Sequence, residues 1–313
     1  MSDLLRSLGF VHTYISSIHR EPAIINHHRY LGHFDQRPLA FQIRIDPHEF
    51  IPFGMDIMPL ISALGWEFLI NLPAQPACPE LVKHFYSNLR CLGIQTKRFS
   101  TLVYGHLLSI PMRALSIILG YPSTGLALSH TSEMWKFDFN LHVEGSKFSG
   151  QPVDSSFEVF PASRLCPKLR IFHYFLTRVL LPRGYSRDQV LPLDIWVLSH
   201  ATAGQKLDYC SLLFGAMISP GDGSLPFGGI VTSLLANTNI NISGFRSESP
   251  TIHLSARNVL TCLGFHVPPS PTRTPLRDPS NLGLLFALND SSSESSDEEL
   301  EADSNSPVPG SSQ

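Results

Sequence analysis

The stretch LGWEFLINLPAQPACPELVKHFYSNLR, residues 64–90, carries most of the information about the fold. A tryptophan-bearing apolar segment runs into a proline-rich break, and the residues that follow place Phe85, Tyr86 and Leu89 on one side of a second helix. Large apolar side chains of this kind pack in cores, and the stretch is poor in the residues that catalysis uses. It therefore predicts short helices that are held together by apolar contacts.

Comparable patterns recur along the chain. Apolar residues at three- and four-residue steps predict helices over 55–69, 79–91, 111–119, 166–181, 188–201, 207–218 and 227–235, with a shorter helical piece at 133–137. Proline in the first turn and glycine after the last turn mark several of these ends. Residues 98–110 are rich in β-branched and aromatic residues around Gly105, which predicts a β-hairpin.

The N-terminal part is less regular. An amphipathic segment at 4–18 is followed by sequence rich in histidine and proline, and Phe41, Ile43 and Ile45 then alternate with polar residues, as in a half-buried strand. We interpret residues 1–53 as a poorly defined lead-in, 54–265 as a helical domain and 266–313 as a disordered tail rich in Pro, Ser and acidic residues. The predicted fold class is mainly α: an irregular helical bundle with a minor β-hairpin element and a disordered C-terminal tail.

Composition narrows the class of protein. The chain has 313 residues, 43% hydrophobic and 16% charged, with 25 prolines. Its apolar runs are shorter than the roughly 18 residues of a membrane span, and the N-terminus lacks the pattern of a secretory signal, so we expect a soluble, intracellular protein, in either nucleus or cytoplasm. The five cysteines are scattered without a CxxC pair, which predicts buried free thiols instead of disulfides or a cysteine-rich zinc site.

Charge is distributed unevenly. Residues 278–313 hold eight acidic residues and no Lys or Arg, whereas residues 1–277 hold 23 basic and 18 acidic ones, a formal charge of +5. Six basic residues surround the helix predicted at 166–181: Arg164, Lys168, Arg170, Arg178, Arg183 and Arg187. Such a cluster suits contact with RNA or an acidic partner. It is also what the solvated face of an amphipathic helix looks like, and we favour that simpler interpretation.

The acidic tail carries a modification pattern. Ser291, Ser295 and Ser296 each have an acidic residue three positions further on, the context that a casein-kinase-2-like kinase prefers. Phosphates there would add negative charge and could bind a basic surface. The sequence therefore predicts phosphorylation at these three serines.

Signatures of catalysis are weak. The chain has no aspartic-protease tripeptide, zinc knuckle or phosphate-binding loop. Candidate carboxylates for a metal-dependent nuclease are scattered, as in any protein of this size: Asp138, Glu144, Asp154, Glu158, Asp188, Asp194 and Asp208.

The histidines give no stronger signal. His27, His28, His33 and His48 could gather as metal ligands but read more simply as a histidine-rich surface loop. His173 falls on the apolar side of its helix and is expected in the core, and the pair Ser199 and His200 lacks a third partner or a nucleophile elbow. We predict no catalytic, cofactor-binding or metal-binding residues, no cofactor and no small-molecule substrate.

Several segments carry a family likeness. GWEFLINLP, PELVKHFYSNLR, TLVYGHLLSIP and MRALSIILGYP follow one another, and SRLCPKLRIFHYFLTRVLLPRGYSRDQVLPLDIWVLSHATAGQKLD and LPFGGIVTSLLANTNI come later. In order and spacing, over residues 54–263, they resemble the plant transposon protein domain family. The resemblance implies an origin in or beside plant long-terminal-repeat retroelements, and it supplies no catalytic residues. The family's usual tryptophan is replaced around Phe172, His173 and Tyr174, and LLPRGYS lacks the threonine of the family's LLPT.

The expected function follows from these points. We expect a non-enzymatic retroelement-derived protein that acts as a scaffold through protein or RNA contacts, without a membrane. One alternative is a divergent metal-dependent nuclease or integrase-like transposition enzyme. Another is a domesticated plant regulatory protein with a phosphorylated tail.

Overall fold

The structure is a computed structural model of the chain. It describes residues 10–14, 34–40, 42–72, 75–91, 97–130, 135–136, 140–150, 159–183, 186–218, 223–238, 240–248 and 251–267. All of these belong to the first of two compact units, Met1–Val267, and the second unit is Pro268–Gln313. The predicted disordered tail beyond Val267 and its serines Ser291, Ser295 and Ser296 lie outside the described residues.

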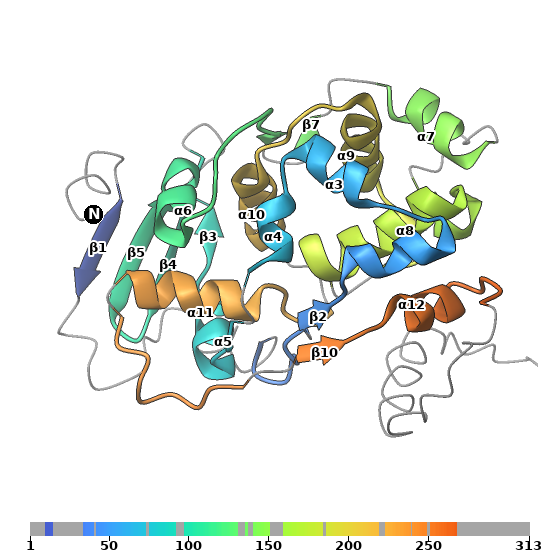
Figure 1. Cartoon of the computed structure of the whole chain (residues 1–313). Helices are drawn as coiled ribbons and strands as arrows, with labels where there is room; N and C mark the ends of the chain where they lie inside the picture. Colours follow the sequence, from blue (N-terminus) through green and yellow to red (C-terminus); the bar gives the residue numbers. More distant parts are fainter. Residues whose placement is uncertain are drawn as a thin grey trace, which may run out of the picture. The chain divides into compact units, whose positions relative to one another are not determined.

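A four-stranded antiparallel sheet forms one side of the first unit (Figure 1). Its order is β1 (Val11–Tyr14), β5 (His106–Pro111), β4 (Arg98–Val103) and β3 (Arg90–Cys91). The predicted hairpin is confirmed as β4 and β5, with Val103 opposite His106 and the turn at Tyr104 and Gly105, both of which have positive φ. It is not an isolated hairpin, because β1 and β3 extend it on both sides.

Two helices pack on this sheet, α5 (Pro79–Ser87) on β4 and α6 (Met112–Leu119) on β5, and α11 (Gly228–Asn237) packs against both helices. The Phe85 ring of α5 meets the Phe99 ring of β4 edge-on at 5.7 Å, and Thr101 Oγ1 donates to the Phe85 carbonyl at 2.8 Å. The helix predicted at 79–91 ends at Ser87, because the chain turns through Asn88 to pair Arg90 with β4.

The other side of the unit is helical (Figure 1). It contains α3 (Met58–Leu64), α4 (Glu67–Ile70), α7 (Leu141–Ser149), α8 (Pro167–Phe175), α9 (Pro192–Ala203), α10 (Tyr209–Ile218) and α12 (Ala256–Cys262). α10 contacts α6, and nearly all its residues are buried, which explains its continuous run of apolar residues. The fold is therefore mainly helical with small sheets, as predicted.

The described residues also form three two-stranded sheets: β2 (Gln42–Arg44) with β10 (Thr251–His253), β6 (Ser129–His130) with β7 (Trp135–Lys136), and β8 (Phe160–Pro161) with β9 (Gln189–Val190). Two 3-10 helices lie among them, η4 (Pro47–Phe53) and η5 (Ala162–Arg164). β2 confirms the strand predicted around Ile43, and it pairs in parallel with a strand about 200 positions away.

Several predicted boundaries are wrong. The helix expected at 188–201 starts only at Pro192, because Gln189 and Val190 pair with β8. The helix expected at 55–69 is broken at Gly65, whose φ of 74° ends α3. The helical piece expected at 133–137 is a strand at Trp135 and Lys136, and its other positions lie outside the described residues.

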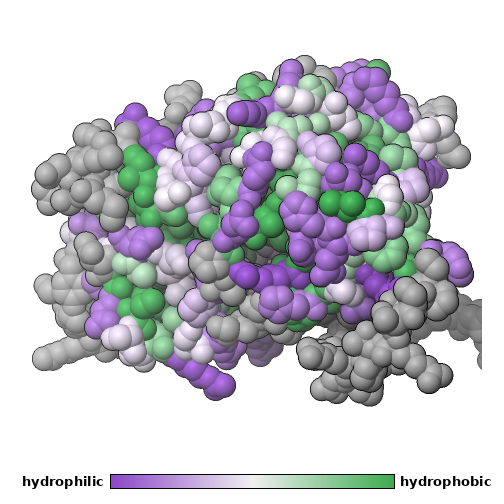
Figure 2. All heavy atoms as spheres, viewed as in Figure 1, coloured by the Kyte–Doolittle hydropathy of each residue, from purple (hydrophilic) through white to green (hydrophobic). Residues whose placement is uncertain are grey.

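The surface is mixed in polarity. On the face shown in Figure 2, hydrophilic and hydrophobic residues alternate over short distances. The exposed large apolar residues come from separate elements: Val11, Ile51, Leu126 and Val143. Apolar residues exposed singly are normal on a folded protein and mark no particular surface. Among the described residues, no helix has both the length and the apolar character needed to cross a membrane.

Candidate functional site

Three of the polar side chains named from the sequence, His173, Arg183 and Asp194, converge where α8 ends and α9 begins. The helix predicted at 166–181 starts with Pro167 in its first turn and runs as α8 to Phe175, then widens into a π-helix, η6 (Leu176–Leu180). Thr177 Oγ1 donates to the His173 carbonyl at 3.0 Å within this widened turn. π-helical turns are rare and often occur at functional sites, which makes the surroundings of η6 a candidate site.

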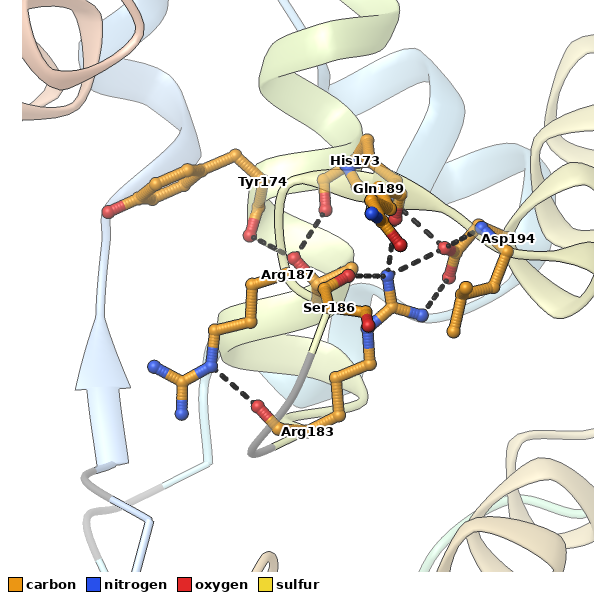
Figure 3. A network of polar contacts seen from close by, with 9 residues as sticks. His173, Tyr174, Arg183, Ser186, Arg187, Gln189 and Asp194 are labelled. Carbon is orange, nitrogen blue, oxygen red and sulfur yellow. Dashed lines mark hydrogen bonds and ion pairs between the residues drawn. The ribbon is translucent and has the colours of Figure 1, made fainter. Parts of the chain in front are cut away.

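Asp194 is the centre of a buried polar network (Figure 3). Its carboxylate is in the first turn of α9, and Oδ2 accepts the Leu191 N–H at 2.8 Å, as an acidic residue at this helix position commonly does. Arg183 reaches both oxygens, with Nη1 3.1 Å from Oδ1 and Nη2 2.9 Å from Oδ2. His173 Nε2 lies 3.1 Å from Oδ2. Asp194 and His173 are only 3% and 1% exposed.

The protonation of Asp194 follows from these contacts. Burial alone would raise its pKa, because a carboxylate loses hydration in the interior. The Arg183 guanidinium, the hydrogen bond from His173 and the Leu191 N–H together outweigh burial and lower the pKa below its usual value. Asp194 is therefore an anion at neutral pH, fixed in place by three donors from different segments.

The network ties separate segments of the chain together. Arg183 also donates through Nη2 to the Ser186 carbonyl at 2.9 Å and to the Gln189 carbonyl at 2.7 Å, so one guanidinium closes the loop from η6 to β9. The prediction that His173 is a core residue is confirmed. Its partner Asp194, 21 positions away, could not be identified from helix periodicity.

In a serine–histidine pair that acts as nucleophile and base, the serine hydroxyl is hydrogen-bonded to the imidazole. Ser199 Oγ instead donates to Glu144 Oε2 at 3.1 Å, whereas His200 Nδ1 lies 2.8 Å from the Trp196 carbonyl. The two residues are adjacent in sequence but have these different partners.

The six basic residues are not equivalent. Arg164 is exposed and Lys168 is partly exposed, near the start of α8. Arg170 stacks its guanidinium on the Phe265 ring at 5.4 Å, and Arg178 stacks on Tyr174 at 4.5 Å. Arg183 is committed to Asp194, and Arg187 Nε donates to the Arg183 carbonyl at 2.6 Å.

The other carboxylates also have local roles. Glu144 pairs with Lys147 at 2.6 Å within α7, and Asp188 lies 3.7 Å from Arg178. Asp208 Oδ1 accepts the Cys210 N–H at 3.0 Å at the start of α10, and burial raises the pKa of this carboxyl. The remaining predicted carboxylates, Asp138, Asp154 and Glu158, lie outside the described residues.

The structure describes only one residue of the candidate histidine cluster, His48. His48 is exposed in η4, with its backbone N–H on Asp46, and His27, His28 and His33 lie outside the described residues. Within the described ranges, no three His, Cys, Asp or Glu side chains come together as metal ligands.

Sequence reasoning missed Tyr174 and the loop carbonyls at Ser186 and Gln189. The position of Tyr174 midway between Arg170 and Arg178, at steps of four, was a usable signal for a shared helix face. The loop carbonyls left no signal, since any residue type supplies them. No family model, curated protein or solved structure matches this chain.

Proposed function

We propose that this protein is a non-enzymatic scaffold, derived from a plant retroelement as the segment order over 54–263 suggests, that binds RNA through the basic residues around α8. These residues are Arg164, Lys168, Arg170, Arg178 and Arg187, here named the α8 basic region. An irregular bundle of helices packed on α9 and α10 would hold these residues in place. Arg183 is not included, because its charge is already matched by Asp194.

The observation that supports the proposal is the charge balance of the α8 basic region. Asp188 is the acidic partner that the described residues supply to it, 3.7 Å from Arg178, and the Asp188 side chain is 83% exposed. Five cations with one exposed carboxylate leave a local excess of positive charge. Phosphate backbones bind such surfaces and release counterions as they do so.

The first experiment measures binding of the full chain to a fluorescently labelled single-stranded RNA by anisotropy at several salt concentrations. We expect affinity to fall as salt rises. The double variant Arg164→Gln with Lys168→Gln should bind more weakly at low salt. If both residues contact phosphates, it should also flatten the plot of log affinity against log salt by about 1.4, the value for two contacts on a single strand.

Arg246→Gln is the matched control, because Arg246 is 89% exposed and belongs to a different surface segment. It should bind RNA as the wild type does. Salt-independent binding, or an equal loss of RNA affinity in the double variant and in Arg246→Gln, would refute the α8 basic region as the RNA-binding surface. Cleavage of the RNA in the presence of Mg²⁺ would favour the nuclease alternative instead.

A further inference from the structure

Two arginines of the α8 basic region, Arg178 and Arg187, lie beyond the end of α8. Arg178 has a side chain only 9% exposed, and its guanidinium lies on the Tyr174 ring. Arg187 follows η6 in the loop, and its guanidinium points away from the Asp194 network in Figure 3, on the side where the Tyr174 ring lies. Both arginines are next to Asp188, one through space and one along the chain.

Their hydrogen bonds are incomplete. A guanidinium has five N–H donors and almost never loses its charge. Among the described residues, Arg178 makes no hydrogen bond: its Nε is buried without an acceptor, and Nη2 is 3.7 Å from Asp188, which is an ion pair but too long for a hydrogen bond. Arg187 uses only Nε, on the Arg183 carbonyl. Buried donors without acceptors are uncommon in folded proteins and call for a partner.

The electrostatics agree with the geometry. Burial lowers the pKa of Arg187, and the positive charge of Arg178 lowers it further, so the two guanidinium groups destabilise one another. The ring of Tyr174 offsets part of this cost for Arg178 through a cation–π contact. With Asp188 counted, the pair keeps a formal charge of +1, which one phosphodiester anion would neutralise.

We propose that Arg178 and Arg187 form a binding site for one phosphate group of an RNA backbone. A planar guanidinium can donate two parallel hydrogen bonds to two oxygens of one phosphate, so arginine suits this ligand better than lysine does. Arg170 has its guanidinium on a different ring, that of Phe265, and is not part of this site.

This inference rests on the proposed function, so the test separates the two. Full-length Arg187→Gln and Arg178→Gln are compared with the wild type for RNA affinity at low salt. Each should weaken binding about tenfold, because each removes charge-assisted hydrogen bonds to one anion. Arg187→Lys keeps the charge without the fork and should recover only part of the affinity. Thermal midpoints of all variants establish that they fold. Because Arg187 lies in a loop, Arg187→Gln and Arg187→Lys should disturb the fold less than Arg178→Gln does.

A second readout uses inorganic phosphate alone. The ³¹P resonance of phosphate should broaden on addition of the wild-type protein and stay sharp with Arg187→Gln, with Arg246→Gln behaving as the wild type does. If folded Arg187→Gln and Arg178→Gln bind RNA normally while Arg164→Gln with Lys168→Gln does not, the site is wrong and the proposed function stands. If phosphate is broadened by the wild type only but RNA does not bind, RNA is the wrong ligand, and binding of a phosphoserine peptide would identify a protein partner in its place.

Discussion

Trp66 Nε1 donates a hydrogen bond to the carbonyl oxygen of Leu207 at 2.9 Å, across 141 positions of sequence. Trp66 is fully buried, and the Leu207 N–H in turn donates to the Leu64 carbonyl at 3.2 Å. The Trp66 ring also meets Tyr209 edge-on at 5.5 Å. The break between α3 and α4 is thus fixed to the start of α10 by two hydrogen bonds and one aromatic contact.

Replacing Trp66 by Phe should destabilise the protein by about 2 kcal/mol, because it leaves the Leu207 carbonyl without its buried donor and removes part of the indole. Urea unfolding followed by circular dichroism measures this change without relying on tryptophan fluorescence. Ile51→Ala is the control, since Ile51 is 49% exposed and its truncation should have little effect. Equal midpoints for Trp66→Phe and the wild type would show that the hydrogen bond contributes nothing.

Gly125 lets a third segment join this junction. Leu126 N–H donates to the Lys206 carbonyl at 2.9 Å, and Asp208 N–H donates to the Leu126 carbonyl at 2.9 Å. Gly125 has a φ of 101°, and a Cβ there would lie 2.6 Å from the Lys206 carbonyl group, which is backbone and cannot rotate away. The close approach of these two segments therefore requires glycine at position 125.

Gly125→Ala should accordingly destabilise the protein by clearly more than about 1 kcal/mol. Gly150→Ala is a matched comparison, because Gly150 also has a positive φ of 65° but has nothing within 4 Å of an added Cβ. The difference between the two variants in chemical denaturation isolates the backbone clash from the cost of the left-handed conformation. If both cost the same, the approach of residues 125 and 206 is looser than described.

The helices with strong apolar periodicity were predictable, because burial on one side leaves a pattern in the sequence itself. α6 is such a helix, and it starts within two residues of the predicted position and ends as predicted. α10 also starts within two residues of its prediction and ends as predicted, but its signal was the length of its apolar run, because nearly all its residues are buried. The short strands were not predictable. β8 and β9 have two residues each, and Gln189 and Val190 become strand only because Phe160 and Pro161 lie opposite them. Two residues are too few for an alternating pattern to show.

The candidate site was predictable in part for the same reason. The basic residues around α8 are visible in sequence, and so is the apolar position of His173. The sequence does not show which of these residues already has an acidic partner, because that depends on Asp194 accepting from both His173 and Arg183. A long-range polar contact leaves no period to detect.

The thiols should differ sharply in reactivity. Burial, and then the nearby Asp208 carboxylate, raises the pKa of Cys210 to about 12, and burial also raises the pKa of Cys78. Cys166 and Cys262 are exposed, although burial of its sulfur raises the pKa of Cys262 as well. Since the thiolate is the nucleophile, iodoacetamide at pH 8 should label Cys166 first among these four cysteines and Cys262 more slowly. Cys78 and Cys210 should react only after urea unfolds the protein.

Peptide mass spectrometry at successive times measures these rates site by site. Cys166→Ser supplies the control, since it should remove the fastest-labelled peptide and leave the other rates unchanged. Labelling of Cys210 in the folded protein as fast as that of Cys166 would contradict the burial of α10.

Asp194→Asn should be the most destabilising of these single substitutions. Removing the carboxylate charge leaves Arg183, 13% exposed, without its anion, and breaking a buried ion pair from one side costs about 3–5 kcal/mol at pH 7. The effect should depend on pH with a definite sign. The folded pKa of Asp194 is below the ordinary value of 3.8, so its charge stabilises the fold above that pH. That stability disappears as pH falls through the lower, folded pKa.

Urea midpoints of the wild type and Asp194→Asn should therefore be far apart at pH 7 and begin to approach one another as the pH falls below about 4, the ordinary pKa of an unfolded aspartate. They should meet only below the lower, folded pKa of Asp194, where the wild-type carboxylate is protonated. Asp188→Asn is the matched control, since Asp188 is 83% exposed and its pair with Arg178 should contribute less than about 1 kcal/mol. A constant difference between wild type and Asp194→Asn from pH 7 to pH 3 would mean that the lost stability comes from altered packing. Convergence confined to acid pH identifies the Asp194 charge, held by Arg183 and His173, as the element that fixes α9 to the end of α8.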